Sequence, residues 1–109
     1  MTNYQQLTIY ISESARWQKK PLYEALIERA RQENIAGAMV IRGVEGFGIH
    51  HSIHTANLLA LASDLPLEIR IIDRQEEIAR FFPLVKEMVQ GGLVTLEDIN
   101  VVLYPQRVD

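Results

Sequence analysis

A chain of 109 residues with 48% hydrophobic and 23% charged residues is long and apolar enough to form one domain, residues 1–109, with its own core. The absence of cysteine excludes disulfides, thiolate metal sites and a cysteine nucleophile, and the net charge of -3 provides no basic surface for nucleic acid. Since no apolar run approaches the roughly 18 residues of a membrane-spanning helix, and the N-terminus lacks a signal-peptide pattern, we expect a cytoplasmic protein.

The first half of the chain predicts a strand, a helix and a second strand. Apolar and polar residues alternate over residues 7–12, which is the period of a strand. A polar stretch then leads to Pro21, which is suited to the first position of a helix that runs to about Asn34. Residues 38–42 form the second strand, apolar on both faces apart from Arg42. The buried stripe of the helix would consist of Leu22, Ala25, Leu26 and Ala30.

The second half repeats this order. Residues 67–72 alternate as a third strand, and Asp73 with Glu76 fits a capping box at the start of a second helix. Because Pro83 lies inside the helical pattern and removes a backbone hydrogen bond, we expect a kink or a break near residues 80–83. The helix would end before a pair of glycines, followed by a capped turn over residues 95–99 and a last strand over residues 100–104.

Two such units predict an α+β fold, the ferredoxin-like βαββαβ sandwich, in which both helices cover one face of a four-stranded antiparallel sheet. The other face would present Tyr10, Ile72 and one side of the second strand, interrupted by polar residues. An apolar face left open to water favours association, and closed rings of subunits commonly bury such a face. The helix-covered face would be built from Leu7, Ile9, Ile11, Leu67, Ile69 and Ile71.

The connection between the second and third strands is the candidate functional segment, because a loop of about twenty residues is unusually long for a compact domain. Three glycines at its start could bring backbone N–H groups close to a phosphate, and Arg42 adds a forked cationic donor. The alternatives are that the glycines only provide turn geometry, and that Arg42 forms a salt bridge with Glu45 or Glu68.

Four segments, KPLYEALIERA, IAGAMVIRGVEGFG, IHTANLLALASDLPLEIRIID and GGLVTLEDINVVLY, resemble the uncharacterised PII-like family, relatives of the PII nitrogen-signalling regulators. The resemblance covers nearly the whole chain. It implies a homotrimer whose long loop, the T-loop, contacts a target protein such as a membrane transporter or channel. It also implies an adenine nucleotide between subunits and no required cofactor. The implied ligand-binding residues are Gly37, Arg42, Gly43, Gly46 and Gly48 at the loop base and Gly91, Gly92 and Leu93 before the last strand.

The sequence departs from the PII pattern in the glycine turn, which is GGLVT and lacks the lysine that contacts phosphates in PII proteins. This departure favours a smaller or different nucleotide over ATP with 2-oxoglutarate. We expect a signalling protein and not an enzyme. A serine, Ser52 or Ser63, could be combined with Asp64 and a histidine into a catalytic triad, but no nucleophile-elbow pattern supports one.

A second hypothesis comes from His50, His51 and His54, which contain an i, i+4 pair of imidazoles, the spacing of metal ligands on a helix. It predicts a metal-responsive trimer, as in the structurally similar divalent-cation tolerance proteins. The competing interpretation is a solvated or pH-responsive histidine cluster.

Overall fold

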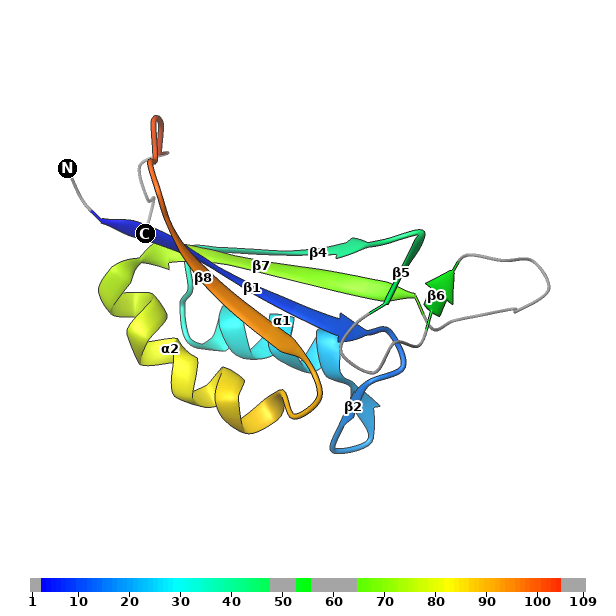
Figure 1. The fold of residues 1–109 in the computed structure, drawn as a ribbon. Coiled ribbons are helices and arrows are strands. Elements are labelled where there is room, and N and C mark those ends of the chain that lie inside the picture. The colour runs from blue at the N-terminus through cyan, green and yellow to red at the C-terminus, as the bar shows by residue number, and fades with distance from the viewer. Residues whose placement is uncertain (1–2, 48–52, 56–64, 105–109) are drawn as a thin grey trace.

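The computed structural model describes residues 3–47, 53–55 and 65–104. Over these residues the chain folds into a four-stranded antiparallel sheet with two helices on one face (Figure 1). The sheet order is β4 (Gly37–Arg42), β7 (Pro66–Arg74), β1 (Tyr4–Ser12) and β8 (Leu93–Ile99). The helices are α1 (Leu22–Gln32) and α2 (Gln75–Met88). This architecture confirms the predicted ferredoxin-like fold.

The remaining described strands form two small hairpins. β5 (Glu45–Phe47) pairs with β6 (Ile53–Thr55), and β2 (Arg16–Trp17) pairs with β3 (Lys20–Pro21). Gln18 and Lys19 turn the second hairpin with φ angles of 47° and 74°, a left-handed conformation at both positions that matches a two-residue hairpin turn. The sequence predicts only a polar stretch here, since neither Gln18 nor Lys19 is one of the glycine or asparagine residues typical of such a turn.

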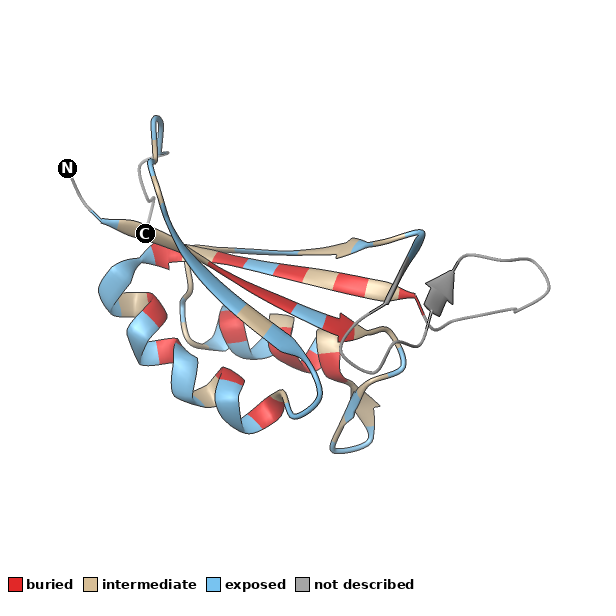
Figure 2. Cartoon of the chain, viewed as in Figure 1, coloured by how far each residue is buried: buried red, intermediate tan, exposed pale blue. Residues whose placement is uncertain are grey.

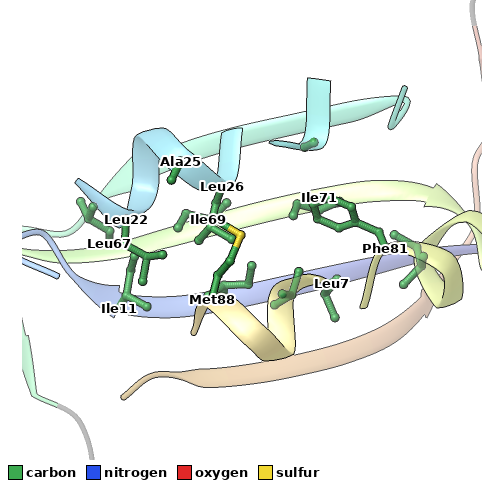
Figure 3. Packing of buried hydrophobic residues seen from close by; sticks show 14 residues of the cluster. Leu7, Ile11, Leu22, Ala25, Leu26, Leu67, Ile69, Ile71, Phe81 and Met88 are labelled. Atoms are coloured by element: carbon green, nitrogen blue, oxygen red, sulfur yellow. The ribbon is translucent and has the colours of Figure 1, made fainter. Parts of the chain in front are cut away.

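The core lies between the helices and one face of the sheet. Along β7 every second residue is buried (Figure 2). In β1 the alternation is incomplete, because Thr8, on the face turned away from the helices, is buried together with Leu7, Ile9 and Ile11. The predicted face of six aliphatic residues is fully buried there, as is the predicted stripe of α1 (Figure 3). From α2 the core receives Ile78, Phe81, Val85 and Met88.

The predicted capping box at the start of α2 is wrong. Asp73 lies within β7, because that strand stays paired with β1 as far as Arg74 opposite Tyr4. The buried Asp73 carboxylate instead accepts hydrogen bonds from the backbone N–H groups of Ala36, at 2.9 Å, and Arg74, at 2.7 Å. It therefore joins the chain before β4 to the end of β7.

Two further expectations about the second half are corrected. Helix α2 runs unbroken through Pro83, because buried residues on both sides of the proline belong to one stripe that packs against the sheet. The last strand is residues 93–99 and not 100–104, since pairing with β1 places Leu96 opposite Leu7. Residues 100–104 lie beyond the strand, and Val102 and Leu103 are almost fully exposed.

Candidate ligand-binding site at the loop base

The long connection begins and ends at one end of the sheet. β4 and β7 are antiparallel neighbours, so the exit at Arg42 lies opposite Leu67, close to the return at Pro66 (Figure 1). Gly43 follows directly and donates its backbone N–H to the Pro66 carbonyl at 2.7 Å. A Cβ on Gly43 would lie 2.9 Å from Cγ of Pro66, so glycine permits this close approach. We call Glu13, Arg42, Gly43, Leu65 and Pro66 the loop base.

Glu13 connects the two sides of the loop base. Its backbone N–H donates to the Leu65 carbonyl at 2.8 Å, and its carboxylate accepts a charge-assisted hydrogen bond from Nη2 of Arg42. The Glu13 side chain is only 14% exposed, whereas that of Arg42 is 53% exposed. Arg42 is thus anchored on one side and accessible on the other.

Glu13 was not predicted as the salt-bridge partner of Arg42, for which Glu45 and Glu68 were the candidates. Glu68 instead accepts a hydrogen bond from Nε of Arg70 at 2.6 Å. Glu13 could have been found from topology alone, because an antiparallel ferredoxin-like sheet places the end of its first strand beside the start of its third. Here the register pairs Ser12 with Pro66, which brings the next residue to the returning end of the loop.

The glycine turn Gly91, Gly92 and Leu93 lies at the same end of the sheet but on the opposite edge. Leu93 pairs with Tyr10 of β1. The next residue of β1, Ile11, pairs with Leu67, which in turn pairs with Arg42. Three strand spacings separate the two edges, or roughly 14 Å. A Cβ on Gly92 would lie 2.6 Å from the backbone oxygen of Tyr10, so the turn packs directly on β1.

The other residues implied by the family resemblance are not gathered at the loop base of one subunit. Gly37 begins β4 and pairs with Ile72, five residues and roughly 16 Å along the strand from Arg42. Gly46 lies in β5, paired with His54 of β6. Gly48 and the histidines His50 and His51 lie outside the described residues.

The metal hypothesis therefore falls on a segment that the structure describes only at the backbone of His54. Within the described ranges, no group of three or more His, Cys, Asp or Glu side chains is arranged to hold a metal ion.

The sheet face turned away from the helices is partly apolar. Tyr10, Met39 and Leu93 are 39%, 55% and 61% exposed on it. A polar row crosses the same face, where Nε2 of Gln6 donates to Oγ1 of Thr8 at 3.1 Å. We call this surface the open sheet face. Its mixed character agrees with the alternation in the sequence.

Membership of a known protein family follows from the sequence comparison. Residues 4–101 match the model of the family DUF190, described as Uncharacterized ACR. A UPF0166 protein of Aquifex aeolicus is 40% identical over 96 residues, which are 88% of this chain and 90% of that protein. The chain belongs to the DUF190 family.

Solved structures place the DUF190 fold among PII-like proteins. A protein of Thermus thermophilus described as PII-like and signalling aligns with a TM-score of 0.66 at 16% identity, covering 93% of this chain and 91% of that one. CPII, a nitrogen regulatory PII-like protein of Thiomonas intermedia bound to ADP, AMP and bicarbonate, aligns with a TM-score of 0.61 at 17% identity, covering 91% and 88%. The resemblance to an uncharacterised PII-like family is confirmed at the level of fold.

Arg80, another exposed cation, joins the two helices. Its guanidinium donates to Oε1 of Glu77 at 2.9 Å and to Oε1 of Glu33 at 2.8 Å. The Glu77 carboxylate above all, with Glu33, raises the pKa of Arg80 above its ordinary value, so this exposed cation is engaged in holding α1 to α2.

Neither helix of the described chain is long and apolar enough to cross a membrane.

Proposed function

We propose that this protein is a PII-type regulator. It assembles as a homotrimer and binds an adenine nucleotide or a related small anion in the clefts between subunits. The long loop between β4 and β7 acts as a T-loop that contacts a target protein, for which a membrane transporter or channel is the proposed class.

The position of the two phosphate-binding candidates supports this proposal most strongly. Arg42 with Gly43, and the turn from Gly91 to Leu93, lie at one end of the sheet but on opposite edges, β4 and β8. They are too far apart in one subunit to hold the same phosphate. In a closed ring, each interface joins two different surfaces of neighbouring identical subunits. We propose that the β4 edge of one subunit meets the β8 edge of the next. The loop base of one subunit and the glycine turn of the next could then line a shared cleft.

Chemistry at the loop base supports an anionic ligand. The half-exposed guanidinium of Arg42 uses Nη2 for Glu13, and a guanidinium has five N–H donors in all. Next to it, the backbone N–H of Gly43 already donates to the Pro66 carbonyl, so Arg42 supplies the donors of this site. The ADP, AMP and bicarbonate bound by CPII are anions of this kind in a protein of the same fold.

Surface composition supports the trimer. The open sheet face exposes Tyr10, Met39 and Leu93, and the chain beyond β8 exposes Val102 and Leu103. Exposed apolar side chains on one face of a soluble protein favour association, which is why we propose this face for the subunit contact.

A ligand shifts the conformation of a loop only if it binds the two loop conformations with different affinity. A ligand at the loop base, where the T-loop leaves the sheet, could bias the T-loop toward or away from its target in this way.

Calorimetric titration with AMP and ADP tests the ligand. Arg42→Ala should weaken binding by about ten- to a hundredfold, because a charge-assisted hydrogen bond typically contributes about 1.5–3 kcal/mol. Arg42→Lys should restore only part of the affinity, since an ammonium cannot reproduce the planar fork. Arg74→Ala is the matched control, because Arg74 is also about half exposed beside one carboxylate but lies at the other end of β7. Normal nucleotide binding by Arg42→Ala would refute the phosphate role.

A further inference from the structure

The loop base contains an internal anion beside its only cation. The two sides of the loop, residues 42–47 and 65–66, and the glycine turn, residues 89–93, contain one cationic side chain, Arg42. The carboxylate of Glu13 already forms an ion pair with that guanidinium. A ligand phosphate that reaches Arg42 therefore meets a nearly neutral pair and not an isolated positive charge.

We infer that Glu13 is a specificity-determining residue that limits the negative charge of the ligand. It neutralises Arg42 and penalises each further charge, so that the site accepts AMP at least as well as ATP. This inference rests on the proposed nucleotide site and names the class of ligand that the site takes, an anion with few charges.

Glu13 is held too firmly to leave when a ligand arrives. Its side chain is 14% exposed, and its own backbone N–H is bonded to Leu65 at the returning end of the loop. If Arg42 turned away to a phosphate, it would leave a largely buried carboxylate without this partner, which is strongly unfavourable. Arg42 instead stays with Glu13 and offers its other N–H groups through its exposed side.

The charge on the ligand then decides its affinity. AMP, ADP and ATP differ by about one negative charge per step, and each added charge is repelled by Glu13 while gaining little from the neutralised Arg42. The glycine turn has no cation to offset this charge.

Calorimetry with AMP, ADP and ATP, in buffer without divalent cations, tests the inference on four proteins. In the natural protein, affinity should stay level or fall from AMP to ATP. In Glu13→Gln, affinity should rise by about three- to fivefold with each added phosphate, because the repulsion is gone while the amide oxygen can still accept from Arg42. Glu13→Asp retains the charge and should keep the natural order. Glu76→Gln removes the same charge from an exposed site beside Arg74, at the opposite end of the sheet, and should also keep it.

The outcomes separate this inference from the proposed function. If all four proteins bind nucleotides in the same order, the role of Glu13 is refuted and the nucleotide site stands. If no protein binds any of the three nucleotides, both are refuted. If thermal unfolding shows that Glu13→Gln does not fold, the inference is tested by measuring how salt changes the affinities of the natural protein for AMP and ATP. Screening of Glu13 should then raise the ATP affinity relative to AMP, and a ratio unchanged by salt refutes the inference.

Discussion

Single residues at the glycine turn have separate steric roles. Gly91 and Gly92 are adjacent, and neither has a positive φ angle. A Cβ on Gly92 would lie 2.6 Å from the Tyr10 backbone oxygen and 2.8 Å from Cγ2 of Ile11, whereas a Cβ on Gly91 would meet no atom within 4 Å. The sequence marks both glycines alike, and only the packing of the turn against β1 distinguishes them.

The substitution Gly92→Ala should therefore lower the free energy of unfolding by about 1–3 kcal/mol, because the backbone of β1 or of the turn must shift. Gly91→Ala should be neutral or slightly stabilising, since alanine restricts the unfolded chain without meeting an obstacle. Urea unfolding of both variants at one protein concentration measures the difference. Equal losses in the two variants would contradict the assigned close approach.

Asp73 and Glu13 show how the environment sets the role of a carboxylate. Asp73 with Glu76 has the spacing of a capping box, yet pairing of β7 with β1 draws Asp73 into the sheet, where it binds Ala36. Glu13 stands at the start of a polar stretch, yet the register of the same two strands brings it to Arg42. In both cases the decisive partner is more than twenty residues away along the chain.

At the level of elements, α2 tolerates a proline that its local sequence disfavours. Pro83 has no N–H to bond the carbonyl of Ala79, but Phe81 and Val85, both fully buried, hold the helix against the sheet on either side. Packing of an amphipathic face commonly dominates local propensity in this way. The predicted break is wrong for this reason, and its alternative, a kink near residues 80–83, stays a prediction.

Replacement of Pro83 should show how much stability the helix loses through the missing hydrogen bond. Pro83 is exposed, so Pro83→Ala removes no core contact, restores one helical hydrogen bond, and should raise the free energy of unfolding by about 1 kcal/mol or more. Lys86→Ala, an exposed change in the same helix, should alter it by less than about 0.5 kcal/mol. Denaturant unfolding of the two variants provides the comparison. A less stable Pro83→Ala would indicate that the proline ring itself makes a stabilising contact, for example with another subunit.

On the scale of the whole molecule, the helices cover one face of the sheet and leave the other face open (Figures 1 and 2). The proposed trimer would bury Met39 and its apolar neighbours on that open sheet face. Light scattering should then give three times the 12.5 kDa mass of the chain at micromolar concentration.

The substitution Met39→Glu should convert the assembly to single chains, because it places a charge within the buried interface without disturbing the core of one subunit. Phe82→Glu is the control: Phe82 is 41% exposed but lies on α2, in the helical layer. It should leave the mass unchanged. Assembly by Met39→Glu, or dissociation by Phe82→Glu alone, would place the interface elsewhere.

The sequence by itself determined the order of the main elements, the two layers and the aliphatic face of the core. Those signals are local: a period of two over residues 7–12 and 67–72, and a helical stripe from Leu22 to Ala30, depend on neighbours within one element. The four quoted segments also pointed to the PII-like fold, which the comparisons confirm.

Only the tertiary structure decided where the chain meets itself. The last strand consists of residues 93–99, because these residues pair with β1, although residues 100–104 are the more apolar run. The register of β1, β7 and β4 also places the Glu13 carboxylate within hydrogen-bonding distance of Arg42, and the Asp73 carboxylate within that distance of the Ala36 N–H. Strand register and the contacts of charged side chains depend on the joint packing of distant segments, and no short stretch of sequence contains that information.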